Sequence, residues 1–226
     1  MVENNLLLMD LDYSDKDIIG EKRLQKCIKR VLDIVIAVPL FVIVSPFIII
    51  ACIAIRVESK GNPIYKQTRF GYREKHFTIY KLRTMYDHSS DGNLAAPTAG
   101  DRRVTKVGYI LRKTSIDELP QLFNVIKGDM SIFGPRAVPE KEIRLRIDKL
   151  LIANPDKEDF FKKAMHIRML AKPGMSGMAQ AYGRSSLTVE EATGYDIYYV
   201  MNYSIWLDLK IFLKTVETIF FQRGVN

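Results

Sequence analysis

An uncharged apolar stretch near the N-terminus limits most strongly how this chain can fold. No charged side chain occurs between Asp33 and Arg56. As a helix, residues 34–55 would extend roughly 33 Å, close to the ~30 Å hydrocarbon thickness of a bilayer. By length alone, the stretch is predicted to be a membrane helix.

Two prolines inside this stretch argue against a straight span. Pro39 and Pro46 each remove an amide donor and clash with the carbonyl four residues earlier, so a bend is expected near the middle. The freed carbonyls of Val35 and Val42 need other partners in lipid, and the hydroxyl of Ser45 is well placed to help. After such a break, each half is too short to cross a bilayer alone.

Basic residues flank the stretch on both sides. Five precede it and four follow it, namely Lys22, Arg23, Lys26, Lys29 and Arg30, then Arg56, Lys60, Lys66 and Arg69. The loop charge therefore assigns no inside or outside. From the residues alone two topologies stay open: a re-entrant helix that returns to the same membrane face, and a kinked helix that crosses once with a basic tail.

The formal net charge of +8 indicates that the chain could bind negatively charged partners. Nucleic acid, anionic lipid and phosphorylated metabolites are all admissible on charge. Because no nucleic-acid-binding motif is recognised, nucleic acid is not expected as a partner. The two cysteines, Cys27 and Cys52, have no CxxC or Cys/His neighbour, which argues against a disulfide framework and fits a reducing cytoplasmic setting.

The sequence divides into three parts. Residues 1–30 are interpreted as an N-terminal arm and a basic lead-in helix, residues 31–56 as the membrane segment, and residues 57–226 as a catalytic domain in the cytosol. In the third part, Ile64–Phe70 and Phe77–Leu82 predict a β-hairpin, and residues 87–105 predict a long loop. Helical spacing predicts further helices over 140–149, 157–168 and the C-terminal stretch around 205–220, whose apolar face either packs on the core, the favoured reading, or lies in the membrane interface.

Two adjacent carboxylates are the first candidates for chemistry. With Asp117 as the N-cap of a helix, Pro120 falls in the first turn, where its missing donor costs nothing, and the helix is expected to stop at Gly128. A helix N-terminus lowers the pKa of a carboxylate, so Asp117 is expected to stay ionised. Beside a bound phosphate, such a group can act as a nucleophile or hold magnesium. An isolated pair like Asp117 and Glu118 is more often an ordinary helix cap.

Three other motifs carry basic or glycine-rich elements. A tight Gly134-Pro135 turn presents Arg136, whose planar guanidinium suits bidentate phosphate binding. Lys81 and Arg83 are expected on one strand face. The segment 172–180 contains glycines that allow close approach of the backbone to a ligand. None of the three specifies a function alone.

Taken in order, these motifs resemble those of the bacterial monotopic phosphoglycosyl transferases, also called polyprenyl-phosphate sugar-1-phosphate transferases. The resemblance extends from about Lys29 to the C-terminus. It rests on six segments, which are 29–33, the apolar run with Ser45-Pro46, 81–85, 114–122, 128–136 and 172–180. Two departures are a Met175-Ser176 pair where the family commonly has Ile-Thr, and an insertion at 147–165.

The resemblance implies an α+β, mostly helical fold. Its N-terminal membrane segment would be a re-entrant helix-break-helix, broken at Ser45 and Pro46, joined to a small α/β catalytic domain and amphipathic interfacial helices. The expected location is the bacterial cytoplasmic (inner) membrane, with the catalytic domain on the cytoplasmic face. Oligomeric state stays open, a homo-oligomer included.

The resemblance also implies a reaction and its residues. A sugar 1-phosphate would pass from a UDP-sugar to polyprenyl (undecaprenyl) phosphate through a covalent intermediate on Asp117, which forms a catalytic dyad with Glu118. Asp117 is also the candidate ligand for Mg²⁺, the family's cofactor. The expected substrate-binding residues are Arg112, Arg136, Lys81, Arg83 and Gln180. The alternative is a membrane-anchored binding protein, crossing the bilayer once, without catalysis.

Overall fold

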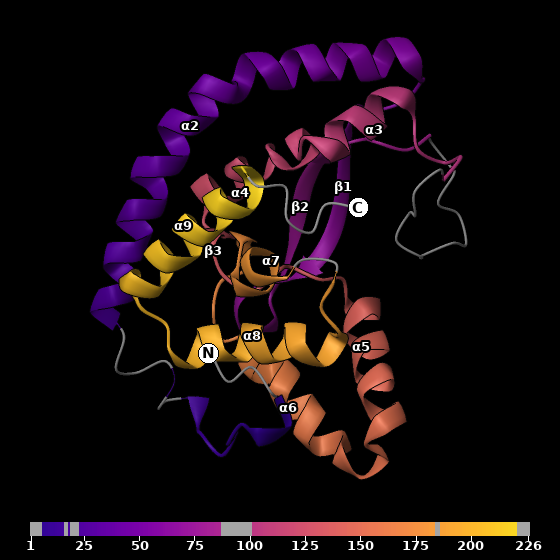
Figure 1. Ribbon diagram of the computed structural model, residues 1–226. Coiled ribbons are helices and arrows are strands. Elements are labelled where there is room, and N and C mark those ends of the chain that lie inside the picture. Colours follow the sequence, from indigo (N-terminus) through magenta and orange to yellow (C-terminus); the bar gives the residue numbers. More distant parts are fainter. Residues whose placement is uncertain (1–5, 16–17, 19–22, 87–100, 184–185, 221–226) are drawn as a thin grey trace.

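The computed structural model describes residues 6–15, 18, 23–86, 101–183 and 186–220. Most of them are helical (Figure 1). The predicted loop at 87–105 lies largely outside the described residues, as does part of the N-terminal arm. The described part of the arm contains a short 3-10 helix, η1 (Leu6–Leu8).

One long helix, α2 (Arg23–Glu58), contains both the basic lead-in and the apolar run. It passes through Pro39 and Pro46 without interruption, so the expected break at Ser45 and Pro46 is a bend within one helix (Figure 1). The hydroxyl of Ser45 donates to the carbonyl oxygen of Val42 at 2.9 Å, as expected for the carbonyl that Pro46 frees. Among the described helices, α2 alone is long and apolar enough to cross a membrane, and only 11% of its most apolar window is buried.

The two ends of α2 are both fastened to the rest of the chain. Near its start, Lys29 pairs with Asp208 at 2.6 Å, and Asp33 accepts hydrogen bonds from the Ser131 hydroxyl and the Ile132 amide. At its end, Glu58 accepts from the amides of Lys106 and Val107 at 2.7 and 2.9 Å.

The predicted hairpin is confirmed. Strands β1 (Ile64–Phe70) and β2 (His76–Leu82) pair antiparallel, with Ile64 opposite Leu82. A second pair, β3 (Ser131–Phe133) and β4 (Gly174–Ser176), is parallel and joins segments far apart in the sequence. No pattern in the sequence indicated this second pairing.

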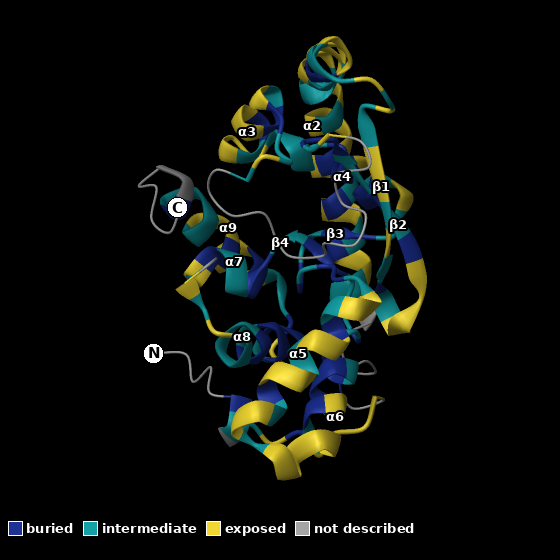
Figure 2. Cartoon of the chain, turned by 90° about the vertical axis from the view of Figure 1, so that its right-hand side faces the viewer, coloured by how far each residue is buried: buried dark blue, intermediate teal, exposed yellow. Residues whose placement is uncertain are grey.

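The remaining helices surround these strands (Figures 1 and 2). They are α3 (Lys106–Lys113), α4 (Gln121–Lys127), α5 (Glu140–Ala153), α6 (Glu158–Arg168), α7 (Met178–Tyr182), α8 (Val189–Met201) and α9 (Ile205–Phe220), with the 3-10 helices η2 (Tyr72–Glu74), η3 (Ile116–Glu118) and η4 (Pro155–Lys157). The three helices predicted from spacing are therefore present. The insertion at 147–165 forms the end of α5, η4 and most of α6.

Three apolar clusters stabilise this arrangement. The largest lies among α5, α6, α8 and α9 and includes the fully buried Phe161, Ile197 and Ile211. The second joins α4 to β2 and takes in Ala37 of α2, and the third packs Ile55 of α2 against α3. Helix α2 therefore contributes to the second and third clusters, while its outer face stays exposed. Helix α9 buries Leu207 and Ile211, which confirms the favoured packing on the core for part of its apolar face, and leaves Trp206, Phe212 and Leu213 exposed.

Candidate active site

The dyad lies in a sharp connection between α3 and α4. Ser115 adopts a left-handed conformation (φ 56°), which turns the chain into η3, where Asp117 and Glu118 lie. The N-cap of α4 is Pro120, so the prediction that Asp117 caps this helix is wrong. The predicted end at Gly128 is confirmed, and its φ of 96° is one that glycine adopts without strain.

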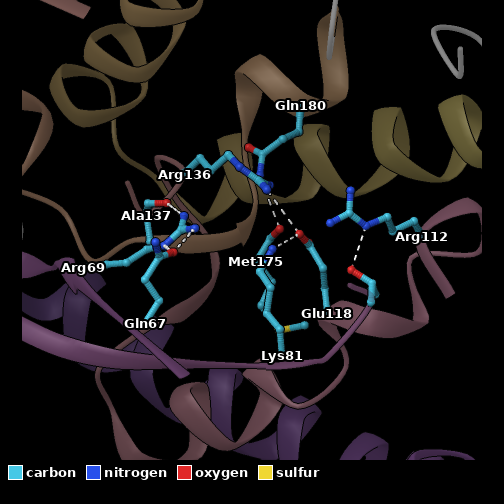
Figure 3. Close-up of polar contacts among 10 residues, drawn as sticks. Gln67, Arg69, Lys81, Arg112, Glu118, Arg136, Ala137, Met175 and Gln180 are labelled. Carbon is cyan, nitrogen blue, oxygen red and sulfur yellow. Dashed lines mark hydrogen bonds and ion pairs between the residues drawn. The ribbon is translucent and has the colours of Figure 1, made fainter. Parts of the chain in front are cut away.

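Glu118 binds two cations. The Lys81 ammonium lies 2.6 Å from its Oε1, and the Arg136 guanidinium lies 3.2 Å from the same oxygen (Figure 3). Burial opposes ionisation of this carboxyl, but the charges of Arg136 and Lys81 outweigh burial and lower its pKa to about 2. Glu118 is thus a permanent anion that holds two basic side chains in place.

Asp117 has the opposite electrostatic setting. Burial and the neighbouring charge of Glu118 raise its pKa, although Lys81 and Arg112 act in the other direction. The expectation of a lowered pKa is wrong because Asp117 is not at a helix N-terminus and shares its surroundings with a second carboxylate. A carboxylate with a raised pKa is the more basic and more nucleophilic of the pair.

Two arginines from different elements approach the dyad. The Nε of Arg112, on α3, donates to the Thr84 hydroxyl at 2.7 Å, and its guanidinium is directed toward Glu118 (Figure 3). Arg136 follows the Gly134-Pro135 turn, and an isolated bridge joins it to Gly174. The pairing of β3 with β4 therefore positions Arg136, while Thr84 positions Arg112.

Sequence reasoning missed a third arginine. Arg69, on β1, donates to the Ala137 carbonyl and to Gln67 beside Arg136 (Figure 3). Burial and the charge of Arg136 lower the pKa of Arg69 to about 10. In the sequence Arg69 counts only as one more basic residue after the apolar stretch. The one signal in the sequence was the position of Arg69 near the end of the predicted strand 64–70.

The other predicted residues divide into two groups. Lys81 reaches the dyad, and Gln180, on α7, lies beside Arg136 (Figure 3) with its Nε2 3.4 Å from the Met175 carbonyl and its buried Oε1 without a partner among the described residues. Arg83 does not reach the dyad. The strand ends at Leu82, and Arg83 turns toward the end of α2, where it donates to the carbonyls of Ser59 and Lys60. These contacts anchor Arg83 at the end of α2, and its role in substrate binding stays a prediction.

Comparison with known proteins identifies the family of this chain. The sequence pattern of the bacterial sugar transferases matches residues 24–222. The chain belongs to the bacterial sugar transferase family. The family prediction made from the motifs is therefore confirmed.

Individual members of the family are similar over most of this chain. A UDP-N-acetylgalactosamine-undecaprenyl-phosphate N-acetylgalactosaminephosphotransferase from Aeromonas hydrophila is 41% identical over 88% of the chain and 45% of its own length. A UDP-glucose:undecaprenyl-phosphate glucose-1-phosphate transferase from Caulobacter vibrioides is 40% identical, over 84% of the chain and 69% of its own length. The sugar transferase EpsL of Bacillus subtilis is 37% identical over 88% of the chain and 90% of its own length. The chain thus spans less than half of the first relative and most of the last.

The candidate site of this family member carries an excess of positive charge. Four cations surround two carboxylates, and these cations are Lys81, Arg69, Arg112 and Arg136. Their side chains come from β1, β2, α3 and the turn after β3. A surplus of guanidinium and ammonium groups is suited to a ligand with several negative oxygens, such as a diphosphate.

The carboxylates offer limited ligands for a metal. Among the described residues, no group of three His, Cys, Asp or Glu side chains could hold a metal ion. Glu118 is already bound by two cations, which leaves Asp117 as the available carboxylate. One carboxylate suffices for Mg²⁺ when substrate phosphates and water supply the other oxygens. The residues therefore fit magnesium brought with a phosphorylated substrate better than a metal bound by protein alone.

Proposed function

We propose that this chain transfers a sugar 1-phosphate from a UDP-sugar to undecaprenyl phosphate in two steps. In the first, a carboxylate oxygen of Asp117 bonds to the phosphorus that carries the sugar, and the bond from that phosphorus to the UMP oxygen breaks. In the second, a phosphate oxygen of the lipid attacks the same phosphorus and releases Asp117. Two displacements at one phosphorus, through a bond to Asp117, constitute covalent catalysis.

The observation that carries this proposal is the contrast within the dyad. Asp117 is half-buried with a raised pKa and lies within the fields of Lys81 and Arg112, whereas Glu118 is committed to Lys81 and Arg136. The uncommitted carboxylate is therefore the nucleophile. Glu118 serves to position the cations and to keep Asp117 basic through like-charge repulsion.

The basic side chains have separate tasks in this scheme. Arg112 and Arg136 bind the diphosphate and stabilise the charge that develops as UMP leaves. The positive charge of Lys81 acts on both carboxylates. It therefore neutralises the charge of Glu118 while Asp117 reacts. Gln180 has a buried, unpartnered Oε1 beside Arg136, which suits a hydroxyl or amide donor of the nucleotide sugar. The named relatives differ in their sugars, and the proposal specifies only a UDP-sugar.

Magnesium is part of the proposal because the family resemblance implies it and the donor set admits it. Asp117, together with substrate phosphate oxygens, would hold the ion. When bound, magnesium would neutralise charge on the diphosphate. The protein's own residues bind the diphosphate, orient it toward Asp117 and hold Glu118 ionised.

We also propose that α2 is re-entrant. It has 36 residues and would be about 54 Å long if straight, yet both of its ends contact the same domain. Lys29 pairs with Asp208 near one end, and Glu58 accepts from the amides of Lys106 and Val107 at the other. A helix that crosses the bilayer once would place these two contacts on opposite sides. The shared domain supports entry and exit through one face, which we assign as the cytoplasmic face of the inner membrane.

Exposed side chains near the site fit an interfacial position. Large apolar groups point outward from three helices, namely Tyr109 and Ile110 of α3, Phe123 of α4, and Trp206, Phe212 and Leu213 of α9. Aromatic side chains of this kind prefer the headgroup region. This position would bring the dyad to the depth at which the phosphate of a lipid acceptor lies.

The activity is tested by measuring release of UMP. The full chain in nanodiscs, with undecaprenyl phosphate and magnesium, is given a panel of UDP-sugars. We expect release with at least one of them, and a labelled phosphosugar adduct on Asp117 when the acceptor is omitted. Asp117→Asn should reduce turnover by at least about 10³-fold and abolish the adduct. Full turnover by this variant would refute the assignment.

The topology is tested separately. Single cysteines are placed at the two termini of a Cys27→Ser, Cys52→Ser background and labelled in intact cells with an impermeant maleimide. The re-entrant arrangement predicts equal protection of both positions until the cells are opened. Labelling of one terminus only would support the single-crossing anchor and remove the membrane part of the proposal.

A further inference from the structure

A second basic site lies at the opposite end of α4 from the dyad. A cavity of about 140 Å³ opens where the start of α2 meets the segments around Lys172 and Tyr203. Arg30, on its wall, donates to the carbonyls of Val125 and Ile126 at the C-terminal end of α4. Because α4 has seven residues, about 10 Å of helix separates this cavity from the dyad.

The walls of this cavity carry more positive than negative charge. Four cations line it, Lys26, Lys29, Arg30 and Lys172, against the single carboxylate of Asp33. Lys29 is neutralised by Asp208, and Asp33 is occupied by the Ser131 hydroxyl and the Ile132 amide. Of the remaining cations, Arg30 and Lys172 are the candidate partners for a ligand.

Two of these cations, Arg30 and Lys172, both approach Gly128. A Cβ on Gly128 would lie 3.2 Å from the Arg30 guanidinium and 3.7 Å from the Lys172 ammonium. Among the described residues, Arg30 donates to two neutral carbonyls and no close ion pair of Arg30 or Lys172 is found, although the charges of Asp33 and Asp129 act on Lys172. Burial and the charge of Arg30 lower the pKa of Lys172, which is the cost of this proximity. An anion between the two groups would relieve it.

The shape of the cavity restricts the anion. A cavity of about 150 Å³ can hold benzene, so a single phosphate group fits in a space of this size. The walls also include the rings of Tyr72, Tyr199 and Tyr203, which can contact an organic group attached to the phosphate. The cavity adjoins the basic start of α2, immediately before the apolar run.

We propose that this cavity binds a phosphate group through Arg30 and Lys172, at a site separate from the dyad. The phosphate belongs either to the headgroup of an anionic phospholipid beside α2 or to a free phosphate compound from the aqueous phase. Binding there joins the start of α2 to the end of α4 and to the segment that leads into β4. This site is independent of the proposed sugar-phosphate transfer.

The reactivity of Lys172 tests the proposal directly. The full chain is placed in phosphatidylcholine nanodiscs, then in nanodiscs that also contain phosphatidylglycerol, and separately in phosphatidylcholine nanodiscs with millimolar inorganic phosphate. Acetylation of each lysine by acetic anhydride is followed by peptide mass spectrometry. A bound phosphate should raise the pKa of Lys172 by about one unit and slow its acetylation about tenfold.

The pattern of protection decides the source. Protection by phosphatidylglycerol alone assigns a lipid headgroup, and protection by inorganic phosphate assigns a free phosphate compound. Lys149, which is exposed on α5, is the internal control. No protection of Lys172 under either condition, or equal protection of Lys149, would overturn the proposal.

A matched pair of variants gives a second measurement. Native mass spectrometry counts the phosphatidylglycerol molecules or phosphate ions retained by the unmodified chain, by Lys172→Met and by Lys149→Met. We expect the bound ligand to be lost only in Lys172→Met. Equal retention by the two variants would contradict the assignment. The labelling experiment stays decisive if Lys172→Met does not fold, since it uses the unmodified chain.

Discussion

Two clusters of partly buried charge can be compared at the two ends of α4. The anchor cluster, at the C-terminal end, joins α2 to α9 and β3, and its members are Lys29, Asp33, Ser131, Tyr199 and Asp208. The dyad cluster, at the N-terminal end, contains Lys81, Arg112, Asp117, Glu118 and Arg136. The first has its charges matched by partners, whereas the second has more cations than anions.

The difference separates a structural role from a binding role. In the anchor cluster, Asp208 accepts from Lys29 and from the Tyr199 hydroxyl, and Asp33 accepts from two donors of β3. Such a cluster is complete without a ligand. The dyad cluster is left with a positive excess that a diphosphate would balance. Removing a charge should therefore reduce stability in the first cluster and activity in the second.

The largest effect is expected from Lys29→Met. This change leaves the carboxylate of Asp208 buried without its cation, and breaking a buried pair in this way costs about 3–5 kcal/mol. The free energy of unfolding, measured by circular dichroism during urea unfolding in detergent, should fall by that amount.

A double variant separates lost charge pairing from lost packing. Lys29→Met with Asp208→Asn removes both charges and keeps an acceptor for the Tyr199 hydroxyl. Most of the lost stability should return, because neutralising both partners of a buried pair leaves no unpaired charge. If the single variant is as stable as the unmodified chain, the anchor cluster does not have the structural role assigned to it.

Glu118→Gln should have the next largest effect, and on activity. The neutral amide no longer balances Lys81 and Arg136, so both lose their fixed positions. We expect kcat/KM for UMP release to fall about 100-fold, as when one preorganised electrostatic contact is removed. Unfolding in urea should change far less than in Lys29→Met. A large loss of stability with unchanged kcat/KM would reverse the assignment of the two clusters.

The pH dependence of the same variant tests the coupling within the dyad. Burial and Glu118 raise the pKa of Asp117, so activity that needs the ionised carboxylate is lost as pH falls through this raised pKa. In Glu118→Gln the like charge is gone while Lys81 and Arg112 remain. The acid limb of the kcat/KM profile should therefore move to lower pH. An unmoved limb would show that Glu118 does not act on Asp117.

Arg112→Lys should have a smaller effect, seen mainly in substrate binding, because lysine keeps the positive charge that stabilises the departing UMP. Lysine keeps the charge but cannot both donate to Thr84 as Nε does and present a planar pair of nitrogens. Loss of one charge-assisted hydrogen bond, worth about 1.5 kcal/mol, should raise KM for the UDP-sugar about tenfold. Lys113→Met, at an exposed neighbouring position, serves as the control and should leave KM unchanged.

The smallest effect is expected from a third, exposed charge cluster. His166 lies 2.7 Å from Glu74 and 3.0 Å from Asp15, and these carboxylates raise its pKa above 6.5. The stabilisation is fully present below pH 6.5 and is lost as pH rises through the raised pKa. Because the three side chains are about half exposed, His166→Gln should cost only about 0.5 kcal/mol in acid and nothing in mild alkali. The thermal unfolding midpoint at the two pH values measures this difference.

Local patterns in the sequence predicted local structure well. The short runs 64–70 and 77–82, the helical spacing in 140–149 and 157–168 and the glycine at 128 each correspond to an observed strand, helix or helix end. These features depend on neighbours a few residues away. The N-cap of α4 was misassigned because Pro120 can itself take that position, which leaves Asp117 in the turn before it.

Contacts between distant segments could not be predicted in the same way. The three-residue strands β3 and β4 are too short to give a periodic signal, yet their pairing places Arg136 at the dyad. Arg69 and Arg83 look alike in the sequence, but one faces the site from β1 and the other turns away because β2 ends before it. The family motifs predicted the dyad with Asp117 as the nucleophile, while the different partners and opposite pKa shifts of Asp117 and Glu118 could be seen only in the structure.

Under the proposed topology, the attachment of both ends of α2 restricts how the catalytic domain can move relative to the membrane. A domain on a flexible tether can lie at many distances from a bilayer, whereas a domain bound to both ends of its membrane helix cannot. With Lys29 at one end and Glu58 at the other, the anchor and the reaction centre move as one rigid body under the proposed topology. The geometry of the bend in α2 would then determine the depth of Asp117 relative to the headgroups, and so its distance from the phosphate of the lipid.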